Sequence, residues 1–450
     1  MRSRLPKVLH PIAGLPMVRQ VVDVGRAIDP AIVVLVVGHA AEQVTAAAGD
    51  GLSIVYQADQ RGTGHAVLQA REALEGRSDL VVVLYGDTVL VQPATLERMT
   101  AAAERAPIVL LTGIVEDPSG YGRIERDLDG RVLRIVETRE GAGELETREI
   151  WAGVVVYQSA WLWEHVGRLP RSASDEIYLT DLVAVAVQEG REVVALHPPD
   201  MVELAGINTQ AQLADVNRVA QDRIRGRLMD CGVRMPDPTT VYVDSGVDVE
   251  GDVVLHPNTH LQGRTRVAAG TEIGPNSIVR DSDLGRDCRV VASVLEACVV
   301  GHGVTIGPFA HLRAGATIED GVELGNYAEV KASRIGAGSR MHHFGYVGDA
   351  DVGRDTNVGA GTVTCNYDGQ AKHHTSVGDG VFIGSDTMLV APVSLGDGAR
   401  TGAGSVVTRD VKPGQLVVGI PARPVPGRSA SPPGPRDADG FMPSAGDASR

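Results

Sequence analysis

The sequence predicts an α/β domain followed by a triangular β-prism, and three observations support this division. Aliphatic residues return at every sixth position over residues 249–279, 300–330 and 377–407, often with Gly beside them. That period fits neither a helix nor an ordinary strand, so it describes a coil whose faces are each about six residues long. Before residue 209, apolar strand-like runs alternate with helical patterns, which is typical of an α/β fold.

The same patterns divide the chain into four parts. We expect residues 1–208 to form the α/β domain, 209–231 a linking helix, 232–423 the prism and 424–450 a disordered tail. The linking helix begins with a capping box from Thr209 to Gln212, followed by apolar residues at helical spacing. The tail is rich in Pro, Gly, Ser and Asp and has few residues that could pack.

In the first domain we expect strands at residues 32–37, 53–56, 80–84, 108–112 and 154–157, with helical patterns such as 66–74 between them. They would form a mostly parallel sheet, which binds ligands beyond the carboxyl ends of its strands. Asp87 follows the strand at 80–84 and could bind Mg²⁺, although a strand-end Asp is more often a turn former. Gln57 and the loop at residues 62–65 follow another strand, and Lys7 could neutralise phosphate.

In the prism, one aliphatic residue per face would point inward and stack on its equivalent one coil above. Gly, Asn and Asp would take the corners, where positive φ is needed. The composition agrees with a narrow prism, because the chain has 54 Gly but only 4% aromatic residues. A β-sandwich is the alternative, but its strands would alternate with a period of two. The repeat resembles that of the hexapeptide-repeat acyltransferases, whose fold is a left-handed parallel β-helix.

The repeat is disturbed between Lys331 and Lys372, where residues freed from core packing are available for function. Acetyl transfer to an amine needs a base that removes the amine proton and N–H donors that stabilise the oxyanion. Histidine is the side chain best suited to this task near neutral pH. Residue type alone leaves four candidates open: His342, His343, His373 and His374.

The bulk properties exclude several classes of partner. A net charge of −15 and a pI near 5.3 argue against binding to nucleic acid or to an anionic membrane. Four cysteines without metal-ligand spacing suggest structural thiols in a reducing compartment. No apolar run is long enough to span a bilayer, and Pro6, Pro11 and Pro16 interrupt any signal-peptide core, so we expect a cytoplasmic protein.

Five motifs together resemble one family. They are Leu5-Pro6-Lys7-Val8-Leu9, Gly62-Thr63-Gly64-His65, Tyr85-Gly86-Asp87, Gly120-Tyr121-Gly122-Arg123 and Gly206-Ile207-Asn208. They look like the uridyltransferase half of the bacterial bifunctional N-acetylglucosamine-1-phosphate uridyltransferases/glucosamine-1-phosphate acetyltransferases, which join this half to a hexapeptide prism. The resemblance implies synthesis of UDP-N-acetylglucosamine: acetyl-coenzyme A acetylates glucosamine 1-phosphate, and UTP then uridylylates the product.

In the first half, the resemblance implies a nucleotide-sugar pocket in which Asp87 and Asn208 hold Mg²⁺. The sugar phosphate would attack the α-phosphorus of UTP and release pyrophosphate, a reaction that needs positioning and charge neutralisation. The implied pocket residues are Lys7, Gln57, Gly62, Thr63, Tyr85, Gly86, Asp87, Gly122, Glu137 and Asn208.

In the second half, the family motif His-x-x-Tyr-x-Gly-Asp matches residues 343–349 and selects His343 as the catalytic base. The resemblance also implies a homotrimer that shares sites between neighbours. The implied residues for glucosamine 1-phosphate are Arg313, Lys331, Tyr346, Asn357, Asn366 and Tyr367. Those for acetyl-coenzyme A are Ala360, Ser385, Ala403 and, as a replacement for a family arginine, Arg423.

The chain departs from the family pattern at three places. The family's first strand and Gly-rich phosphate loop are missing, and loss of a central strand would leave two neighbours unpaired and an apolar surface uncovered. We therefore expect the gene product to extend upstream of Met1. Trp151 stands where the family has a sugar-contacting Asn, and Arg423 follows Pro421, whereas the family's coenzyme-binding Arg precedes the equivalent Pro.

Other functions stay open at the level of sequence. The chain could be a monofunctional glucosamine-1-phosphate acetyltransferase with an inactive first domain, or a non-catalytic regulatory module of nucleotidyltransferase-like form. A metal-dependent prism hydratase would need three matched His ligands, and His302, His311, His342 and His343 do not form that set.

Overall fold

The computed structural model describes residues 1–137, 145–172 and 175–429. The chain divides into two compact units, Met1–Arg223 and Ile224–Arg450, and the division falls inside helix α8 (Gln210–Asp230). The helix begins with a reciprocal capping box, in which the Thr209 N–H donates to Gln212 Oε1 (3.0 Å) and the Gln212 N–H donates to Thr209 Oγ1 (3.1 Å). These bonds satisfy N–H groups that have no partner within the helix.

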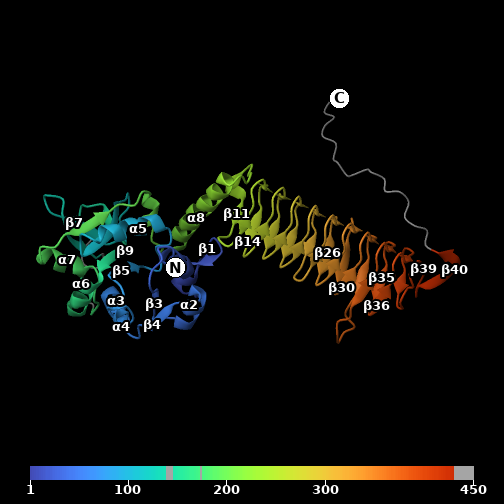
Figure 1. Ribbon diagram of the computed structural model, residues 1–450, viewed down its shortest axis with the longest axis horizontal. Coiled ribbons are helices and arrows are strands. Elements are labelled where there is room, and N and C mark those ends of the chain that lie inside the picture. Colours follow the sequence, from blue (N-terminus) through green and yellow to red (C-terminus); the bar gives the residue numbers. More distant parts are fainter. Residues whose placement is uncertain (138–144, 173–174, 430–450) are drawn as a thin grey trace, which may run out of the picture. The chain divides into compact units, whose positions relative to one another are not determined.

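Helices and strands alternate along the first unit (Figure 1). The helices are η1 (Lys7–Leu9), α1 (Met17–Arg26), α2 (Ala41–Ala48), α3 (Thr63–Gln69), α4 (Arg71–Leu74), α5 (Pro93–Ala102), α6 (Ser159–His165), η4 (Val166–Arg168), α7 (Asp181–Gln188) and η5 (Met201–Leu204). The strands are β1 (Pro11–Ile12), β2 (Leu15–Pro16), β3 (Val34–Val37), β4 (Ser53–Tyr56), β5 (Leu80–Leu84), β6 (Ile108–Ile114), β7 (Arg123–Arg126), β8 (Val132–Val136), β9 (Glu149–Gln158) and β10 (Val193–Leu196). The sequence did not predict β7, β8 and β10.

The main sheet of the first unit has six strands and is mixed, which corrects the expectation of a mostly parallel sheet. β9 lies antiparallel between β5 and β6, and β7 pairs antiparallel with β8. Within the described residues, β10 and β6 are the only parallel pair in this sheet, and β3 and β4 form a separate parallel pair. The sheet is mixed because the long strand β9 runs antiparallel to both of its neighbours. Its ten residues are nearly all buried, and they pair with β5 on one side and with β6 on the other.

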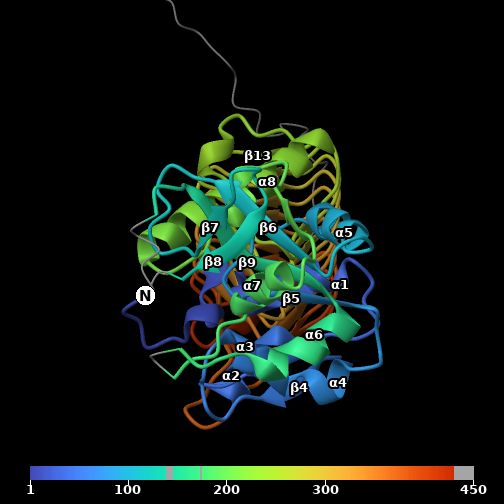
Figure 2. The ribbon, with the colours of Figure 1, turned by 90° about the vertical axis from the view of Figure 1, so that its left-hand side faces the viewer.

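Side chains of β6 and β9 alternate between two cores on opposite faces of this sheet, as the two-residue period of a strand requires. One core joins Ile108, Leu110, Val155 and Tyr157 to residues of α6 and α7. The other joins Val109, Leu111, Val154 and Val156 to residues of α5. Figure 2 shows these helices around the strands. Because helices cover the faces, the ends of the strands are left to bind ligands.

β3 and β5 each have a single partner strand among the described residues. β3 pairs with β4, and β5 pairs with β9. Both strands line a cavity of about 470 Å³, whose walls include Val34, Leu35 and Val36 of β3 and Val82 and Val83 of β5. The unpaired strand edges and the uncovered apolar surface that the sequence led us to expect are therefore both present.

The second unit is a triangular coil of parallel strands that form three sheets (Figure 1). After η6 (Pro238–Thr240), the ten-stranded sheet contains β11 (Tyr242–Val243), β14 (His260–Gln262), β17 (Ile278–Arg280), β20 (Val294–Glu296), β23 (His311–Leu312), β26 (Ala328–Lys331), β29 (Gly345–Gly348), β32 (Val363–Cys365), β35 (Met388–Val390) and β38 (Val406–Val407). The nine-stranded sheet contains β12 (Asp248–Val249), β15 (Arg266–Val267), β18 (Asp283–Leu284), β21 (Val299–Val300), β24 (Thr317–Ile318), β27 (Arg334–Ile335), β30 (Ala350–Val352), β33 (Thr375–Val377) and β36 (Val393–Leu395). The eleven-stranded sheet contains β13 (Val254–Leu255), β16 (Glu272–Ile273), β19 (Arg289–Val290), β22 (Thr305–Ile306), β25 (Glu323–Leu324), β28 (Arg340–Met341), β31 (Asn357–Val358), β34 (Phe382–Ile383), β37 (Arg400–Thr401), β39 (Gln415–Val418) and β40 (Arg423–Ser429).

Every predicted inward position of the prism is buried, which confirms the six-residue period. Those positions are Val249, Leu255, Leu261, Val267, Ile273, Val279, Val300, Ile306, Leu312, Ile318, Leu324, Val330, Val377, Ile383, Leu389, Leu395, Thr401 and Val407. The residue before each of them in a strand is mostly exposed or half-buried. One inward side chain per face thus fills the narrow interior, and the outer side chains are free for function.

Two expectations about the second unit need correction. The coil stays regular from Lys331 onward, because β26 to β32 keep their parallel register, and only residues 366–374 leave the prism before β33 resumes it. This excursion exceeds the length of one face, and the other breaks in the period are faces of five residues, such as those from Val330 to Ile335 and from Val347 to Val352. The expected tail begins later than residue 424, because β40 pairs antiparallel with the free edge of β39, while residues 430–450 lie outside the described residues.

Candidate active sites

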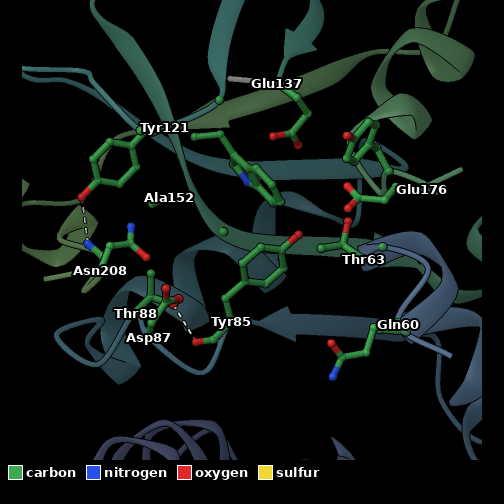
Figure 3. Close-up of a pocket in the computed structure, with 18 of the residues that line it drawn as sticks. Gln60, Thr63, Tyr85, Asp87, Thr88, Tyr121, Glu137, Ala152, Glu176 and Asn208 are labelled. Carbon is green, nitrogen blue, oxygen red and sulfur yellow. Dashed lines mark hydrogen bonds between the residues drawn. The ribbon is translucent and has the colours of Figure 1, made fainter. Parts of the chain in front are cut away.

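A cavity of about 570 Å³ in the first unit is lined by residues that follow the strands (Figure 3). Eight of the ten residues expected in the nucleotide-sugar pocket line it: Gln57, Gly62, Thr63, Tyr85, Asp87, Gly122, Glu137 and Asn208. The other two, Lys7 and Gly86, line the adjoining cavity next to β5, which shares Tyr85 and Asp87 with the first. The structure therefore brings all ten residues to one region.

The loop before α3 is held against this cavity by several local interactions. Gly62 has φ of 93°, and a Cβ atom there would lie 2.5 Å from the carbonyl oxygen of Ile177, so only glycine fits. Thr63 Oγ1 accepts a hydrogen bond from the N–H of Leu179 at 3.0 Å. Gln57 Nε2 donates to the Gly62 carbonyl at 3.2 Å and contacts His65 Nδ1 at 3.0 Å. These bonds fix the Gln57 amide at the edge of the cavity.

One end of the cavity holds two oxygen donors that converge on a cation. Lys7 Nζ donates to Asp87 Oδ2 at 2.5 Å and to Asn208 Oδ1 at 2.7 Å. Asp87 follows β5 and Asn208 follows η5, so the two donors come from segments that lie 121 positions apart in the sequence. One carboxylate and one amide oxygen suit Mg²⁺, which binds few protein ligands and completes its shell with water and phosphate. In this structure the ammonium of Lys7 occupies the position between these two oxygens.

The opposite wall of the cavity is aromatic and acidic (Figure 3). Trp151 is only 6% exposed, and its ring packs edge-on against Tyr85 with 5.3 Å between ring centroids. Its Nε1 donates to the carbonyl of Val154 at 3.1 Å. Burial raises the pKa of Tyr85 well above its usual range. Glu137 accepts from Thr180 Oγ1 at 2.9 Å. Since indole has one N–H, Trp151 has no donor left for a sugar.

Sequence reasoning missed several residues that line this cavity: Gln60, Thr88, Tyr121, Glu176 and Tyr178. Tyr121 had a signal, because it lies within a quoted motif, and its hydroxyl accepts from the N–H of Gly206 at 2.9 Å. That bond ties the segment before β7 to the segment that carries Asn208. Glu176 and Tyr178 had no sequence signal, since only the fold brings their segment beside α3.

In the second unit, four expected substrate residues gather on the ten-stranded sheet of the prism. Arg313 and Asn366 directly follow β23 and β32, whereas Lys331 and Tyr346 belong to β26 and β29, and these four strands are consecutive in the sheet. Asn366 Nδ2 donates to the Tyr346 hydroxyl at 3.4 Å. Arg313 Nη1 donates to Glu329 Oε1 at 2.9 Å. The cationic and polar groups needed for a sugar phosphate therefore share one face.

His343 lies at the corner where the chain enters this face. It stands two residues beyond the end of β28, and Ala360, Ser385 and Ala403 stand two residues beyond β31, β34 and β37. Those four strands are consecutive neighbours in the eleven-stranded sheet. The expected base and three of the expected coenzyme residues thus form one column along a single corner of the prism.

The surroundings of the four candidate histidines differ. His342 Nε2 lies 2.7 Å from Glu323, His373 Nε2 lies 2.7 Å from Asp368, and His374 Nε2 lies 3.2 Å from Asp351. Within the described part of the chain, His343 has no such carboxylate partner. A base must accept a proton from substrate, so the free imidazole of His343 suits the role better than the three paired rings do.

A further cation, Lys372, lies near Lys331 on the face that carries the expected substrate residues. The sequence analysis named Lys372 only as the end of the disturbed region. The nearby Lys372 ammonium lowers the pKa of Lys331, and Arg313 adds to this effect. Lys372 also lies 3.9 Å from Asp349 Oδ2. Three cationic side chains therefore lie near one another on this face, and such a cluster attracts anions.

Two expected residues, Asn357 and Arg423, lie apart from these clusters, and a third, Tyr367, lies on the excursion beside them. Asn357 belongs to β31 in the eleven-stranded sheet, so it lies on a different face from Lys331 and Tyr346. Tyr367 is 61% exposed, and its hydroxyl donates to the Gly369 carbonyl within the excursion. Arg423 begins β40, and its Nη1 donates to the Ala422 carbonyl at 3.2 Å. Among the described residues, no hydrogen bond or ion pair joins Asn357 or Arg423 to the residues gathered around Lys331, whereas Tyr367 pairs with Lys372 at the excursion.

Comparisons with known proteins agree with both halves of this description. A model for a MobA-like NTP transferase domain matches residues 1–123, and a model for the bacterial transferase hexapeptide matches residues 297–332 and 374–409. The chain is 44% identical over 426 residues to a protein of Pelobacter propionicus named Bifunctional protein GlmU, and the match covers 93% of this chain and 92% of that relative. The chain belongs to the GlmU family.

Two further members of the GlmU family support the same assignment. The proteins of that name from Aromatoleum aromaticum and Stutzerimonas stutzeri are 45% and 44% identical to this chain, and each match covers 93% of the chain and at least 92% of the relative. The family resemblance and the fold class predicted from the sequence are therefore confirmed, and the chain is a bifunctional transferase. Among its described helices, none is long and apolar enough to cross a membrane.

Proposed function

We propose that the two sites catalyse the two successive reactions that make UDP-N-acetylglucosamine. This nucleotide sugar is a precursor of the bacterial cell wall. The prism acetylates glucosamine 1-phosphate with acetyl-coenzyme A, and the α/β unit transfers uridylyl from UTP to the resulting N-acetylglucosamine 1-phosphate. The observation that carries this proposal is the assembly of both residue sets, each within its own unit, from segments that are far apart in the sequence.

In the α/β unit, Asp87 and Asn208 hold Mg²⁺ through a carboxylate and an amide oxygen. When bound, the ion neutralises charge on the triphosphate and makes its α-phosphorus more electrophilic. Lys7, which already bonds to both ligands, balances the negative charge of the phosphates. Gln57, Gly62 and Thr63 border the nucleotide, and Gly122 and Glu137 border the sugar. The sugar phosphate oxygen forms the new bond to phosphorus, and pyrophosphate leaves.

In the prism, His343 accepts a proton from the amine of glucosamine 1-phosphate while the nitrogen attacks the thioester carbonyl of acetyl-coenzyme A. The new carbon–nitrogen bond replaces the carbon–sulfur bond, and the coenzyme leaves as its thiol. Arg313 and Lys331 bind the phosphate, with Lys372 as a third cation, and Tyr346 and Asn366 hold the sugar. Ala360, Ser385 and Ala403 line the coenzyme groove along the corner that His343 begins.

A homotrimer completes the acetyl-transfer site in this proposal. Asn357 and Arg423 lie apart from the Lys331 cluster within one chain, so a neighbouring copy supplies these two contacts. Phe309, Tyr327 and Phe344 support an interface at the His343 corner. They stand at equivalent positions, three residues beyond β22, β25 and β28, and each is 56–59% exposed. A column of exposed aromatic side chains is typical of a surface that another protein covers.

We place the enzyme in the cytoplasm on the basis of its thiols. All four cysteines are free, as a reducing compartment allows. Burial raises the pKa of Cys298 to about 11 and also raises that of Cys288, so both remain protonated thiols. These two side chains pack in the prism, where they serve the fold and not the chemistry.

Separate assays of the two reactions test the proposal. Purified chain should acetylate glucosamine 1-phosphate with acetyl-coenzyme A alone, and should form UDP-N-acetylglucosamine from N-acetylglucosamine 1-phosphate only when UTP and Mg²⁺ are both present. Acetylation without any uridylyl transfer would instead support a monofunctional acetyltransferase. Loss of both reactions would support a regulatory module.

A further inference from the structure

The excursion of residues 366–374 is a closed structure with its own internal bonds. Its two arms pair at Tyr367 and Lys372, and the N–H of His373 donates to the Asn366 carbonyl at 2.7 Å. At its turn, Asp368 Oδ1 accepts from the N–H groups of Gln370 and Ala371 at 2.8 and 2.7 Å. Figure 1 shows this loop projecting from the prism near β30 and β36. Such a loop keeps its shape, but bonds at its base must set its position on the prism.

One residue of the prism, Asp349, contacts both arms of this excursion. Its carboxylate Oδ2 accepts a hydrogen bond from Asn366 Nδ2 and lies 3.9 Å from Lys372 Nζ. Its backbone carbonyl accepts from the N–H of Thr375 at 3.1 Å, and its own N–H donates to the Lys331 carbonyl at 3.2 Å. Asp349 thus joins the first, the seventh and the following residue of the excursion to the coil that carries Lys331.

The carboxylate of Asp349 also decides which way the Asn366 amide faces. An ionised carboxylate has no proton to donate, so the Asn366 NH₂ group must point to it, and the same group reaches the Tyr346 hydroxyl at 3.4 Å. The Asn366 carbonyl oxygen is then left as an acceptor. Asn366 is only 9% exposed, so its side chain has little room to turn. A neutral amide at position 349 could serve as donor or acceptor and would leave this orientation undefined.

Asp349 further balances the positive charge of the substrate face. Lys331, Lys372 and Arg313 carry like charges that repel one another. The Asp349 carboxylate is only 23% exposed and attracts Lys372 from the prism side. We propose that Asp349 is a positioning residue of the acetyl-transfer site, which orients Asn366 and holds Lys372 beside Lys331. This inference rests on the proposed acetyl transfer and extends it to a residue that does not touch substrate.

The variant Asp349→Asn tests this role, because it removes the charge and the obligatory acceptor while it keeps the size of the side chain. We expect the KM for glucosamine 1-phosphate to rise about 10-fold, as the loss of a charge-assisted bond allows, while kcat changes less than about 3-fold. Hydrogen exchange at the backbone amides of His373 and Thr375 should be about 10-fold faster than in the wild type. This second readout does not depend on activity.

Asp351→Asn is the matched control, because Asp351 also contacts the excursion, through His374 at 3.2 Å, but touches neither Asn366 nor Lys372. It should leave the KM and the exchange at His373 within about 2-fold of wild type, as for most surface changes. Wild-type exchange in Asp349→Asn, or equal effects of both variants, would overturn the proposal. If Asp349→Asn does not fold, Asp349→Ser carries the same test. A wild type that does not acetylate would overturn the proposed function, while the exchange measurement would still decide the role of Asp349.

Discussion

Lys7 Nζ and Asp87 Oδ2 lie 2.5 Å apart and join η1 to the end of β5 in an ion pair that is about one-third exposed on the lysine side. The same ammonium reaches Asn208 Oδ1 at 2.7 Å. A single cation therefore sits between the two expected ligands of Mg²⁺. A metal ion held by Asp87 and Asn208 would compete with Lys7 for the same two oxygens.

Replacing Asp87 with Asn should remove uridylyl transfer and leave acetyl transfer intact. The neutral amide binds a divalent cation far less well than a carboxylate, and we expect a rate loss of about 100-fold or more. Binding of Mn²⁺, followed by electron paramagnetic resonance, should weaken in parallel. Asp23→Asn is the control, since Asp23 pairs with Arg19 on α1 and is away from the cavity. Equal Mn²⁺ affinity in Asp87→Asn and wild type would contradict the metal assignment.

His343→Ala should abolish acetyl transfer while the melting temperature stays near that of the wild type. The side chain lies at a corner and has no carboxylate partner within the described residues, so its removal costs no packing or ion pair. His342→Ala is the matched control, because that neighbouring ring pairs with Glu323 at 2.7 Å and should affect the rate little. Acetylation by His343→Ala at more than about a tenth of the normal rate would show that it is not the general base.

Trp151→Asn should change the sugar preference of the uridyltransferase site. In the wild type the indole N–H is bonded to Val154, so recognition at this wall rests on shape and apolar contact. The asparagine variant regains a free donor and acceptor, and we expect its preference for N-acetylglucosamine 1-phosphate over glucose 1-phosphate to rise about 10-fold in kcat/KM. Trp151→Phe, which keeps an apolar wall, should not show this gain. An unchanged preference in Trp151→Asn would mean that this wall does not face the sugar.

Ile306→Ala should lower the free energy of unfolding of the prism by about 2–5 kcal/mol, because the side chain is fully buried in the stacked interior. Val299→Ala offers a matched control, since Val299 is aliphatic, lies in the adjacent strand β21 and is 51% exposed. It should change the free energy of unfolding by about 0.5 kcal/mol or less. Urea denaturation of both variants gives the comparison, and similar losses would contradict the inward assignment.

The inward residues of the prism could be predicted over three runs of the six-residue period, whereas the sheet of the first unit could not be predicted. In the prism, each inward residue such as Ile306 or Leu312 meets its equivalent in the next coil, so the spacing in the sequence sets the packing. In the first unit, β9 pairs with β5 and β6, which lie far from it in the sequence, and no local pattern predicts such pairing. The strands β4 and β5 have the expected bounds, because short apolar runs bounded by polar residues are local signals.

The candidate sites divide in the same way. Family motifs pointed to Lys7, Asp87 and Asn208, but their convergence on one cation position appears only in the folded chain. The sequence offered four histidines, and the structure distinguishes His343 by the carboxylates that pair with the other three. Glu176 and Tyr178 of the first cavity had no sequence signal at all, because their place depends on packing between distant segments.

By itself, the sequence determined the six-residue coil of the second unit, since that repeat specifies which side chain of each face points inward. It also determined the polar residues that end β4 and β5, since these follow short apolar runs. The tertiary structure alone decided that Asp349 ties Asn366, Lys372 and Thr375 to the prism, and that Lys7 bridges Asp87 and Asn208. The physical reason is that local patterns encode burial, whereas a site depends on charges and hydrogen-bonding groups that meet only after the chain has folded.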